Sequence, residues 1–485
     1  MSTAHVSGGT GLAAALQYFG RFGVDEALIR TALAAALARG GDRADVYFQH
    51  RVAHSLGLED GAVNRAWSGI ELGVGIRVLR GDQTGYGYTE DLTPESVRQA
   101  ALTAAAIADG PSRERPIPQL VATAIPQRYP AKTPWDQVAA ATRLPLLQRV
   151  QERAFAADPR VQKVTVHFSD EEGAVLMVDS DGRVAFDTQP MTLIHLSCMA
   201  EENGRRESNG GNIAGRAGLE FYNDAKLDKL VREAVDRTTI LFEAGQPPAG
   251  EMPVVLGAGS SGILLHEAIG HGLEADFNRK GVSIYADKLG KPIAAPFVTV
   301  VDDATNEGAR GAINIDDEGN AAGVTTLIHD GVLQTYLHDS ISARHYGVQP
   351  TGNGRRESFR HAPLPRMRST YMLPGPHTPE EIIASVDRGI YCGNFANGQV
   401  QIGAGDFTFY VKNGWLIEGG KLTRPIKDVN LIGNGPKVLE QIDMVGNDLK
   451  IDDGGWTCGK DGQSVPVSQG MPTTRVRAMT VGGRG

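Results

Sequence analysis

The sequence predicts an α+β protein, with mixed helix and antiparallel-sheet regions followed by a β-rich, barrel- or sandwich-like C-terminal domain. Three observations support this fold class. Residues 11–39 are rich in alanine at helical spacing, whereas residues 45–87 alternate apolar and polar residues as hairpin strands do. After residue 246, short apolar runs alternate with Gly, Asn and Asp, a pattern typical of sheet-rich domains.

Two proline-containing segments divide the chain. Residues 1–110 form the predicted N-terminal α+β domain, which ends with an alanine-rich helix from Pro94 to Ala108. Residues 111–135 form a predicted linker, because six prolines fall there without periodicity. Gln246-Pro247-Pro248-Ala249-Gly250 marks the second boundary, so the β-rich C-terminal domain covers residues 246–485.

Between these boundaries, residues 136–245 form a predicted central α+β region. Long helices are expected at its two ends, over residues 136–157 and 226–244. Four short strands are expected between the helices, over residues 161–168, 174–178, 183–187 and 191–199. This region therefore repeats the mixed composition of the first domain.

The composition excludes several classes of protein. The chain has 485 residues and a formal net charge of −9, which disfavours nucleic-acid binding. Three cysteines do not make a disulfide framework, so a reducing compartment is expected. No secretory leader and no apolar run long enough to span a membrane are recognised. We therefore expect a cytoplasmic protein without a membrane partner.

The most informative feature is the run His266-Glu267-Ala268-Ile269-Gly270-His271. Two histidines can hold one metal ion, and a neighbouring carboxylate can act on a metal-bound water. Metalloprotease helices usually space the histidines at i and i+4, but here the second is at i+5. On a regular helix they would point roughly 140° apart. A widened π-helical turn near Gly270 would align them, since glycine tolerates irregular backbone.

Spacing alone does not identify a third ligand. Cys458 lies in a glycine-rich loop from which a thiolate could reach a metal, whereas Cys198 lies in a predicted strand and is expected in the core. Cys392 is ambiguous, and Glu274 and Asp276 follow the second histidine closely enough to be candidates. The alternative to a metal site is two core histidines at an accidental spacing.

Several further segments make the chain similar to the TldD/PmbA (TldE) family of bacterial metalloproteases. They run over nearly the whole sequence: Asp45–Gln49, Gly73–Arg77, His266–Lys280, Gly354–Ser358, Pro365–Met367, Thr370–Gly375 and Gly454–Lys460. The family motif is H-E-x-x-x-H, as here. The resemblance implies that His266, His271 and Cys458 bind zinc and that Glu267 is the general base. It also implies unstructured peptide substrates and a heterodimer with a homologous TldE/PmbA-like subunit that lacks the metal motif.

A short internal repeat concerns two arginine pairs. Asn203-Gly204-Arg205-Arg206-Glu207-Ser208 recurs as Asn353-Gly354-Arg355-Arg356-Glu357-Ser358. Paired arginines could meet a peptide carboxylate, which makes Arg355 and Arg356 candidate substrate-binding residues. The alternative is two solvated turns with local ion pairs.

The leading functional hypothesis is therefore a zinc-dependent peptidase acting on unfolded peptides or partly degraded proteins. Two other hypotheses are kept. The first is a non-enzymatic modulator subunit in which the metal is structural. The second is a different metal hydrolase, such as an amidase acting on small molecules.

Overall fold

The computed structural model describes residues 11–108, 110 and 116–482, so residues 111–115 of the predicted linker lie outside the described residues. Helices and antiparallel sheet alternate in the N-terminal and central parts, and the C-terminal part contains a closed barrel. The predicted α+β fold class is therefore confirmed. None of the helices in the described part of the chain is long and apolar enough to cross a membrane.

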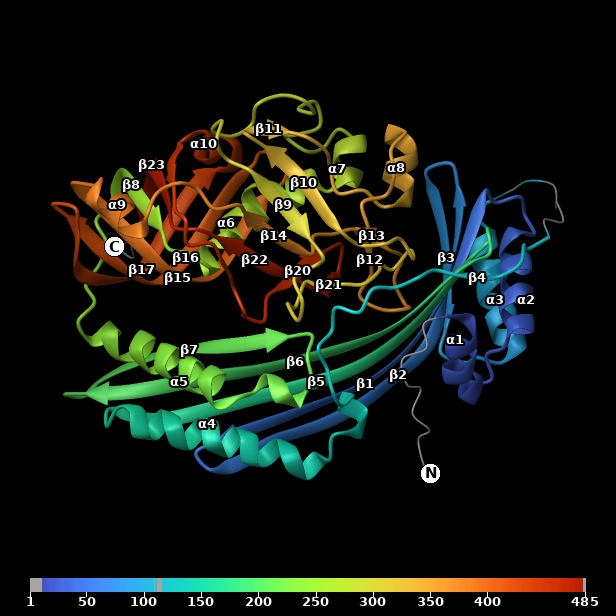
Figure 1. Ribbon diagram of the computed structural model, residues 1–485, viewed down its shortest axis with the longest axis horizontal. Coiled ribbons are helices and arrows are strands. Elements are labelled where there is room, and N and C mark those ends of the chain that lie inside the picture. Colours follow the sequence, from blue (N-terminus) through green and yellow to red (C-terminus); the bar gives the residue numbers. More distant parts are fainter. Residues whose placement is uncertain (1–10, 109, 111–115, 483–485) are drawn as a thin grey trace.

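One long, curved sheet runs through the N-terminal and central regions (Figure 1). Its strand order is β3-β2-β1-β5-β6-β4, and β7 pairs with residues 192–202 of β6. Because β1 pairs with β5, residues from both sides of the predicted linker belong to the same sheet. The strands are β1 (Arg43–Glu59), β2 (Ala62–Arg80), β3 (Gln83–Thr89), β4 (Val121–Ala122), β5 (Val161–Asp179), β6 (Arg183–Glu202) and β7 (Arg205–Gly215).

The four short strands predicted for the central region are wrong, because β5 and β6 are each continuous. The polar residues between the predicted strands over 161–168 and 174–178 include Asp170, whose buried carboxylate accepts a 2.5 Å hydrogen bond from Nε of Arg143. Pro190, in the gap between the predicted strands over 183–187 and 191–199, lies opposite Glu172 of β5 and beyond the last β7 partner at Thr192. A proline is tolerated more easily there because β6 has no β7 partner at this position.

Helices cover one face of this sheet. Even-numbered residues of β5 supply both cores beneath them, Leu176 and Val178 at one end and Val164 and Phe168 at the other. The first core packs against α1 (Leu12–Phe19), α2 (Glu26–Leu37) and α3 (Pro94–Ala105), and the second against α4 (Arg143–Ala157) and α5 (Asp224–Thr239). Since side chains alternate across a strand, the odd-numbered residues face the C-terminal domain.

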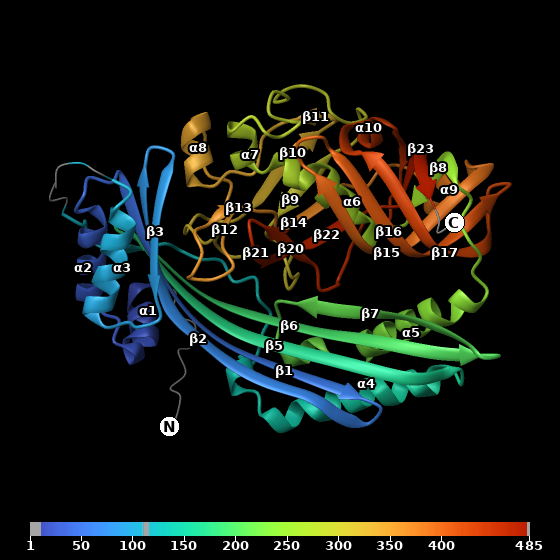
Figure 2. The ribbon, with the colours of Figure 1, turned by 180° about the vertical axis from the view of Figure 1, so that it is seen from behind.

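The C-terminal domain lies along the sheet (Figure 2). The contact between them is both apolar and ionic. Tyr47 of β1 packs with Phe359 of the C-terminal domain, together with two apolar residues of β5. Beside this cluster the buried Arg77 guanidinium lies 2.7 Å from the Asp45 carboxylate and 2.6 Å from that of Glu318. These contacts hold the C-terminal domain against the face of the sheet that the helices do not cover.

The C-terminal domain is built around a barrel. Strands β17-β16-β15-β8-β23 follow one another, and pairing of β23 with β17 closes the ring, with β18 added to β23. The bounds are β8 (Gly250–Leu256), β15 (Arg388–Gln401), β16 (Asp406–Glu418), β17 (Lys421–Asn434), β18 (Ile442–Val445) and β23 (Thr474–Gly482).

A second sheet and several short elements complete this domain. The sheet has the order β11-β10-β9-β14-β22-β19, with β9 (Val300–Asp303), β10 (Val324–His329), β11 (Val332–Leu333), β14 (Ser369–Met372), β19 (Lys450–Ile451) and β22 (Ser468–Met471). Two small hairpins are β12 (Gly354–Arg355) with β13 (Leu364–Pro365), and β20 (Thr457–Lys460) with β21 (Gln463–Pro466). The helices are α6 (Ile263–Leu265), α7 (Ala275–Arg279), α8 (Ser340–Tyr346), α9 (Pro379–Ala384) and α10 (Gly435–Glu440).

Candidate metal centre

The histidine-bearing segment is a helix of mixed pitch. Helix α6 passes at His266 into a π-helical turn, His266–Gly270, which is followed by a 3₁₀ turn over His271–Leu273. The predicted widening of the helix near Gly270 is confirmed. The wider turn absorbs one extra residue, so that His271 comes to the same side as His266.

Glycine is required at position 270 for a different reason from the one expected. Gly270 has ordinary right-handed helical angles, with φ −54° and ψ −55°. A Cβ atom there would lie 2.0 Å from Sδ of Met367, a buried residue of the same core. Close packing, and not an irregular backbone angle, therefore excludes a side chain at this position.

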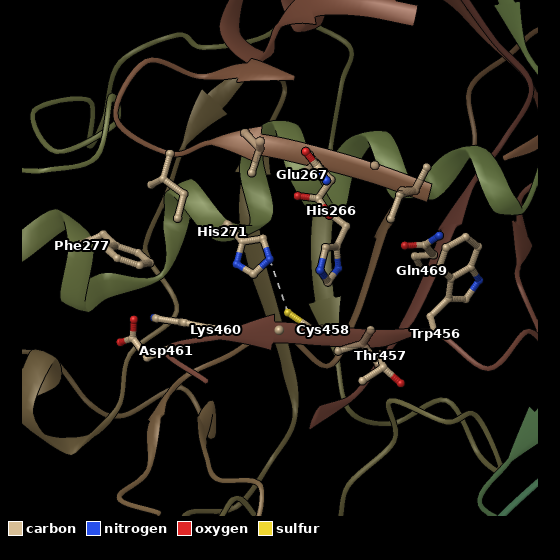
Figure 3. Close-up of a pocket in the computed structure, with 17 residues that line it drawn as sticks. His266, Glu267, His271, Phe277, Trp456, Thr457, Cys458, Lys460, Asp461 and Gln469 are labelled. Carbon is tan, nitrogen blue, oxygen red and sulfur yellow. Dashed lines mark hydrogen bonds between the residues drawn. The ribbon is translucent and has the colours of Figure 1, made fainter. Parts of the chain in front are cut away.

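The two histidines meet a cysteine from a distant part of the chain (Figure 3). The imidazole centroids of His266 and His271 are 5.0 Å apart, and the rings are perpendicular, at 90°. Sγ of Cys458, on β20, lies 3.4 Å from Nε2 of His271. One ligand atom from each of the three residues lies within 4.8 Å of the others, and all three residues are buried.

The environment of Cys458 favours the thiolate. Burial alone would raise the pKa of this thiol, but the charges of His266 and His271 hold it well below the usual value. The other two cysteines behave differently. Cys198 belongs to the core under α4 and α5, and burial raises its pKa to about 12. Cys392 lies in the core of the C-terminal domain, where burial also raises the pKa of its thiol.

The two acidic residues kept as candidate ligands, Glu274 and Asp276, do not belong to the group formed by His266, His271 and Cys458. Oε2 of Glu274 is 3.1 Å from Nδ1 of His271, on the opposite side of that ring from Cys458. The buried ammonium of Lys460 is 3.2 Å from Glu274 and donates a 2.7 Å hydrogen bond to Asp276. Burial alone would raise the pKa of Glu274, but Lys460 and His271 lower it to about 2. Glu274 is thus a charged partner of His271, whose orientation it determines.

Glu267 lies in the same cavity as the three potential ligands. Burial raises the pKa of its carboxyl above the usual value, although the neighbouring histidines oppose that effect. On its other side, Cγ of Glu267 would be 3.4 Å from a Cβ atom at Gly398 of β15, so the carboxylate stands directly beside that strand. A carboxylate of raised pKa beside a metal site is suited to accepting a proton.

The cavity that contains these groups has a volume of about 510 Å³. One wall is the end of β15, including Gly398, Gln399 and Val400, and another is the β20–β21 hairpin. β15 pairs with β8 only at Ile390–Cys392, and its remainder pairs with β16 alone among the described strands. An open strand edge therefore borders the cavity.

The donor set of this centre fits a metal ion. Two imidazoles and one thiolate form a set that favours zinc, and three protein ligands leave a fourth position open. Nδ1 of His266 is buried and has no hydrogen-bond partner in the described part of the chain. A buried imidazole nitrogen costs free energy unless something satisfies it, and a bound cation would do so.

The two candidate substrate-binding arginines do not reach this cavity. Arg355 is buried and donates hydrogen bonds to the carbonyl oxygens of Met367, at 2.6 Å, and Pro466, at 2.8 Å. Arg356 stacks over the Tyr47 ring at 4.2 Å and lies 3.5 Å from the Asp45 carboxylate. Their guanidinium groups thus stand at the contact between the sheet and the C-terminal domain.

Comparisons with known proteins give the same picture. Three family models match the chain: PmbA/TldA metallopeptidase domain 1 at residues 44–108, the central domain at 133–242 and the C-terminal domain at 249–483. A metalloprotease TldD homolog from Haemophilus influenzae is 42% identical over 92% of this chain and 94% of its own length. The chain belongs to the TldD/PmbA metallopeptidase family. It is accordingly a peptidase that requires a metal.

Relatives of the family extend to archaea and to solved structures. A metalloprotease from Methanocaldococcus jannaschii is 32% identical over 90% of this chain and 96% of its own length. A putative modulator of a DNA gyrase from Thermotoga maritima has a TM-score of 0.77 and 22% identity, over 94% of this chain and 100% of that chain. TldE from Thermococcus kodakarensis has a TM-score of 0.73 and 19% identity, over 94% and 99%. These two structures share the TldD/PmbA fold.

Sequence reasoning missed two features of the metal centre. Glu274 was considered as a ligand, but its contact with the far side of His271 could not be inferred from a spacing of three residues. Lys460, which neutralises Glu274 and Asp276, lies two residues after Cys458 in the same glycine-rich segment. The clue available was a lysine in a loop already expected to approach the metal.

Proposed function

We propose that this member of the TldD/PmbA family is a zinc-dependent endopeptidase that cleaves unfolded peptides and partly degraded proteins. In this proposal His266, His271 and Cys458 hold the zinc ion, and Glu267 is the general base. The observation that carries it is the gathering of three ligand atoms within 4.8 Å of one another in a cavity that also contains Glu267.

The chemistry divides between the ion and the protein. When bound, zinc would lower the pKa of a coordinated water and polarise the scissile carbonyl. Glu267 accepts the proton of the attacking water and then donates it to the leaving amine, for which its raised pKa is suitable. Glu274 keeps the His271 ring in place and keeps its Nδ1 occupied, so that Nε2 faces Cys458.

The open edge of β15 supports an extended substrate. A peptide that adds to this edge would form main-chain hydrogen bonds beside Glu267, largely irrespective of its sequence. Folded segments cannot offer a free strand in this way. We therefore expect rapid cleavage of a disordered peptide and much slower cleavage of a rigid folded domain that contains the same sequence. Equal rates for the two substrates would contradict this substrate class.

The partner proposed is a homologous TldE/PmbA-like subunit, in a heterodimer. The fold shared with TldE from Thermococcus kodakarensis supports a relation between two such chains. We also propose a cytoplasmic location, because all three cysteines are free thiols. Light scattering of the chain with and without the co-expressed homologue tests the partner, and a homodimer unaffected by the homologue would oppose it.

The decisive test of the base is Glu267→Gln. This substitution removes the proton acceptor while leaving the three proposed ligands, so peptide cleavage should fall by about 10²-fold or more with bound zinc unchanged. Asp461→Asn is the matched control, since Asp461 is an exposed carboxylate lining the same cavity. Undiminished turnover in Glu267→Gln would exclude Glu267 as the base.

The ligand set is tested by elemental analysis of purified protein. Wild type should contain about one zinc per chain, as a site with a single set of three ligands requires. Cys458→Ala and His271→Ala should lose it, whereas Cys198→Ala, which changes a cysteine in a distant core, should not. Zinc retained in Cys458→Ala would remove the cysteine from the ligand set.

A further inference from the structure

A second cavity lies on the other side of the hairpin that carries Cys458. Its volume is about 250 Å³, and it is lined by the sheet, the β9–β10 connection and the β20–β21 hairpin. Thr457 borders both this cavity and the metal cavity. Its lining contains five arginines and three carboxylates, although the chain as a whole carries a net charge of −9. The lining includes Arg51, Arg216, Arg310, Arg355 and Arg356.

Two of these arginines are neutralised by carboxylates. Arg51 forms ion pairs with Glu71 and, at 3.4 Å, with Glu171. Arg356 lies 3.5 Å from the Asp45 carboxylate. The remaining three, Arg216, Arg310 and Arg355, form no ion pair with any carboxylate in the described part of the chain. None of these three guanidinium groups is therefore in contact with a carboxylate of the lining, although the charges of Glu171 and Asp317 still act on Arg310 and Arg355.

The contacts of two of these groups leave terminal nitrogen atoms available to a ligand, whereas both terminal nitrogens of Arg355 already donate to carbonyl oxygens. Arg216 is only 4% exposed, and Nε donates a 3.3 Å hydrogen bond to the carbonyl oxygen of Arg310. Its two terminal nitrogens have no hydrogen-bond partner among the described residues, yet they are not sealed from solvent. Arg310 uses Nε and Nη2 for Trp456 and Thr457, which leaves Nη1 without a partner in the same described part.

The three charges also repel one another. Burial, together with the charge of Arg216, lowers the pKa of Arg310 to about 10 and that of Arg355 to about 9, although the charges of Glu171 and Asp317 oppose this effect. Burying like charges without an anion is costly, and an anion between them would relieve that cost. Arginine's planar fork matches the oxygen geometry of carboxylates and phosphates.

We propose that this cavity is an oxyanion-binding site, distinct from the metal centre, in which Arg216 and Arg310 bind a carboxylate or phosphate group and Arg355 adds positive charge to the lining. The ligand would also act on the metal-bearing hairpin. Arg310 donates hydrogen bonds to the carbonyl oxygen of Trp456, at 3.0 Å, and to Oγ1 of Thr457, at 3.3 Å. Arg355 donates to the carbonyl oxygen of Pro466, which pairs with Thr457 in the hairpin. An anion that fixes the guanidinium groups would thereby stiffen the strand that carries Cys458.

Isothermal titration of the full chain with inorganic phosphate tests the site, in buffer free of phosphate and sulfate. Arg310→Gln should weaken binding about tenfold or more, because a charge-assisted contact is lost. Arg216→Lys, which keeps the charge but loses the fork, should also weaken it. Arg206→Gln is the matched control from the exposed copy of the repeat. His271→Ala should leave phosphate binding unchanged, which separates this site from phosphate bound at a metal.

Hydrogen exchange supplies a second measurement that does not depend on catalysis. Phosphate should slow exchange of the backbone amides of residues 457–465 in wild type, and not in Arg310→Gln. Absence of phosphate binding, or equal affinity in Arg310→Gln and Arg206→Gln, would overturn the proposal.

Competition identifies the source of the oxyanion. Phosphate is titrated against two peptides that differ only in a free or an amidated C-terminal carboxylate, with Glu267→Gln used to prevent cleavage. If phosphate displaces the free-acid peptide but not the amidated peptide, the site is assigned to the carboxylate of a substrate. Phosphate binding that affects neither peptide would assign it to a free small anion. Both results support an oxyanion site, and only the first rests on the proposed function.

Discussion

The carboxylate of Glu274 offers a test of how the metal centre is organised. Glu274→Gln keeps the shape of the side chain and removes its charge. Oε2 of Glu274 lies 3.1 Å from Nδ1 of His271 and 3.2 Å from Nζ of Lys460, and Oε1 is 3.9 Å from Nε of Arg366. A neutral amide would leave the charges of Lys460 and Arg366 less compensated beside the metal position. It would also make His271 a weaker ligand for the metal.

The size of the effect follows from the contact that is lost. Replacing a buried partner of a metal-binding histidine weakens metal affinity by about 10–100-fold. At about 1.4 kcal/mol per factor of ten, this corresponds to about 1.4–2.8 kcal/mol. The loss should be partial, because Lys460 keeps its 2.7 Å hydrogen bond with Asp276 and all three proposed ligands remain.

Zinc affinity is measured by competition with a chromophoric chelator of known affinity. Glu318→Gln is a matched control, since Glu318 is also a buried carboxylate paired with an arginine, 2.6 Å from Arg77, but lies outside the metal cavity. Glu318→Gln should lower the free energy of unfolding and leave zinc affinity unchanged. The assignment of Glu274 as the positioning residue would be refuted if its variant bound zinc as tightly as wild type, or no more weakly than the control.

Three further predictions concern stability. Gly270→Ala should cost about 1–3 kcal/mol of unfolding free energy, because its Cβ would meet Sδ of Met367 at 2.0 Å; denaturant unfolding checks this, and the added change Met367→Ala should recover part of the loss. Glu172→Gln should stabilise the protein relative to wild type, increasingly from pH 4.5 towards pH 8. Burial raises the pKa of Glu172 from 4.5 to about 8, so the folded state of wild type binds this proton more tightly than the unfolded state and wild type loses stability as the pH rises. Thermal unfolding of both proteins across this pH range checks the trend, which should be absent if the carboxyl is solvated. Arg77→Met leaves the buried Glu318 carboxylate without an arginine and leaves Asp45 only its weaker pair with Arg356, so it should cost about 3–5 kcal/mol in urea unfolding. A cost under 1 kcal/mol would show that the sheet and the C-terminal domain do not depend on this contact.

The metal-bearing helix was predictable because its chemistry is local. The i+5 spacing of the histidines required a wider turn, and a π-helical turn at His266–Gly270 is present. The position of Cys458 was not derivable from spacing, because 187 residues separate it from His271 and only the fold brings them to 3.4 Å. Glycine-rich surroundings indicated a loop that could approach the metal, and the family resemblance indicated which cysteine.

The length of the strands was not predictable from local polarity. A run of polar residues ordinarily ends a strand, but Asp170 continues β5 because Arg143, from another element, neutralises its buried carboxylate. Arg143 and Asp170 are 27 residues apart in the chain, so a local sequence pattern cannot show that one neutralises the other. The same limitation applies to Glu274, whose role depends on a lysine near the far end of the sequence.

The repeated segment shows most directly why short patterns do not determine a role. In the first copy, Asn203 and Gly204 take positive φ angles of 52° and 77° and form the tight turn between β6 and β7. Its second arginine, Arg206, points to solvent with 70% of its side chain exposed and pairs with Glu201. In the second copy, Asn353 is buried and donates to the Asp302 carboxylate at 2.8 Å, and the arginines that follow are buried as well. Identical residues thus make a solvated hairpin in one place and one wall of a charged cavity in the other, because burial changes what a guanidinium group requires. The solvated copy needs no ligand, whereas the buried copy is the one that an anion would complete.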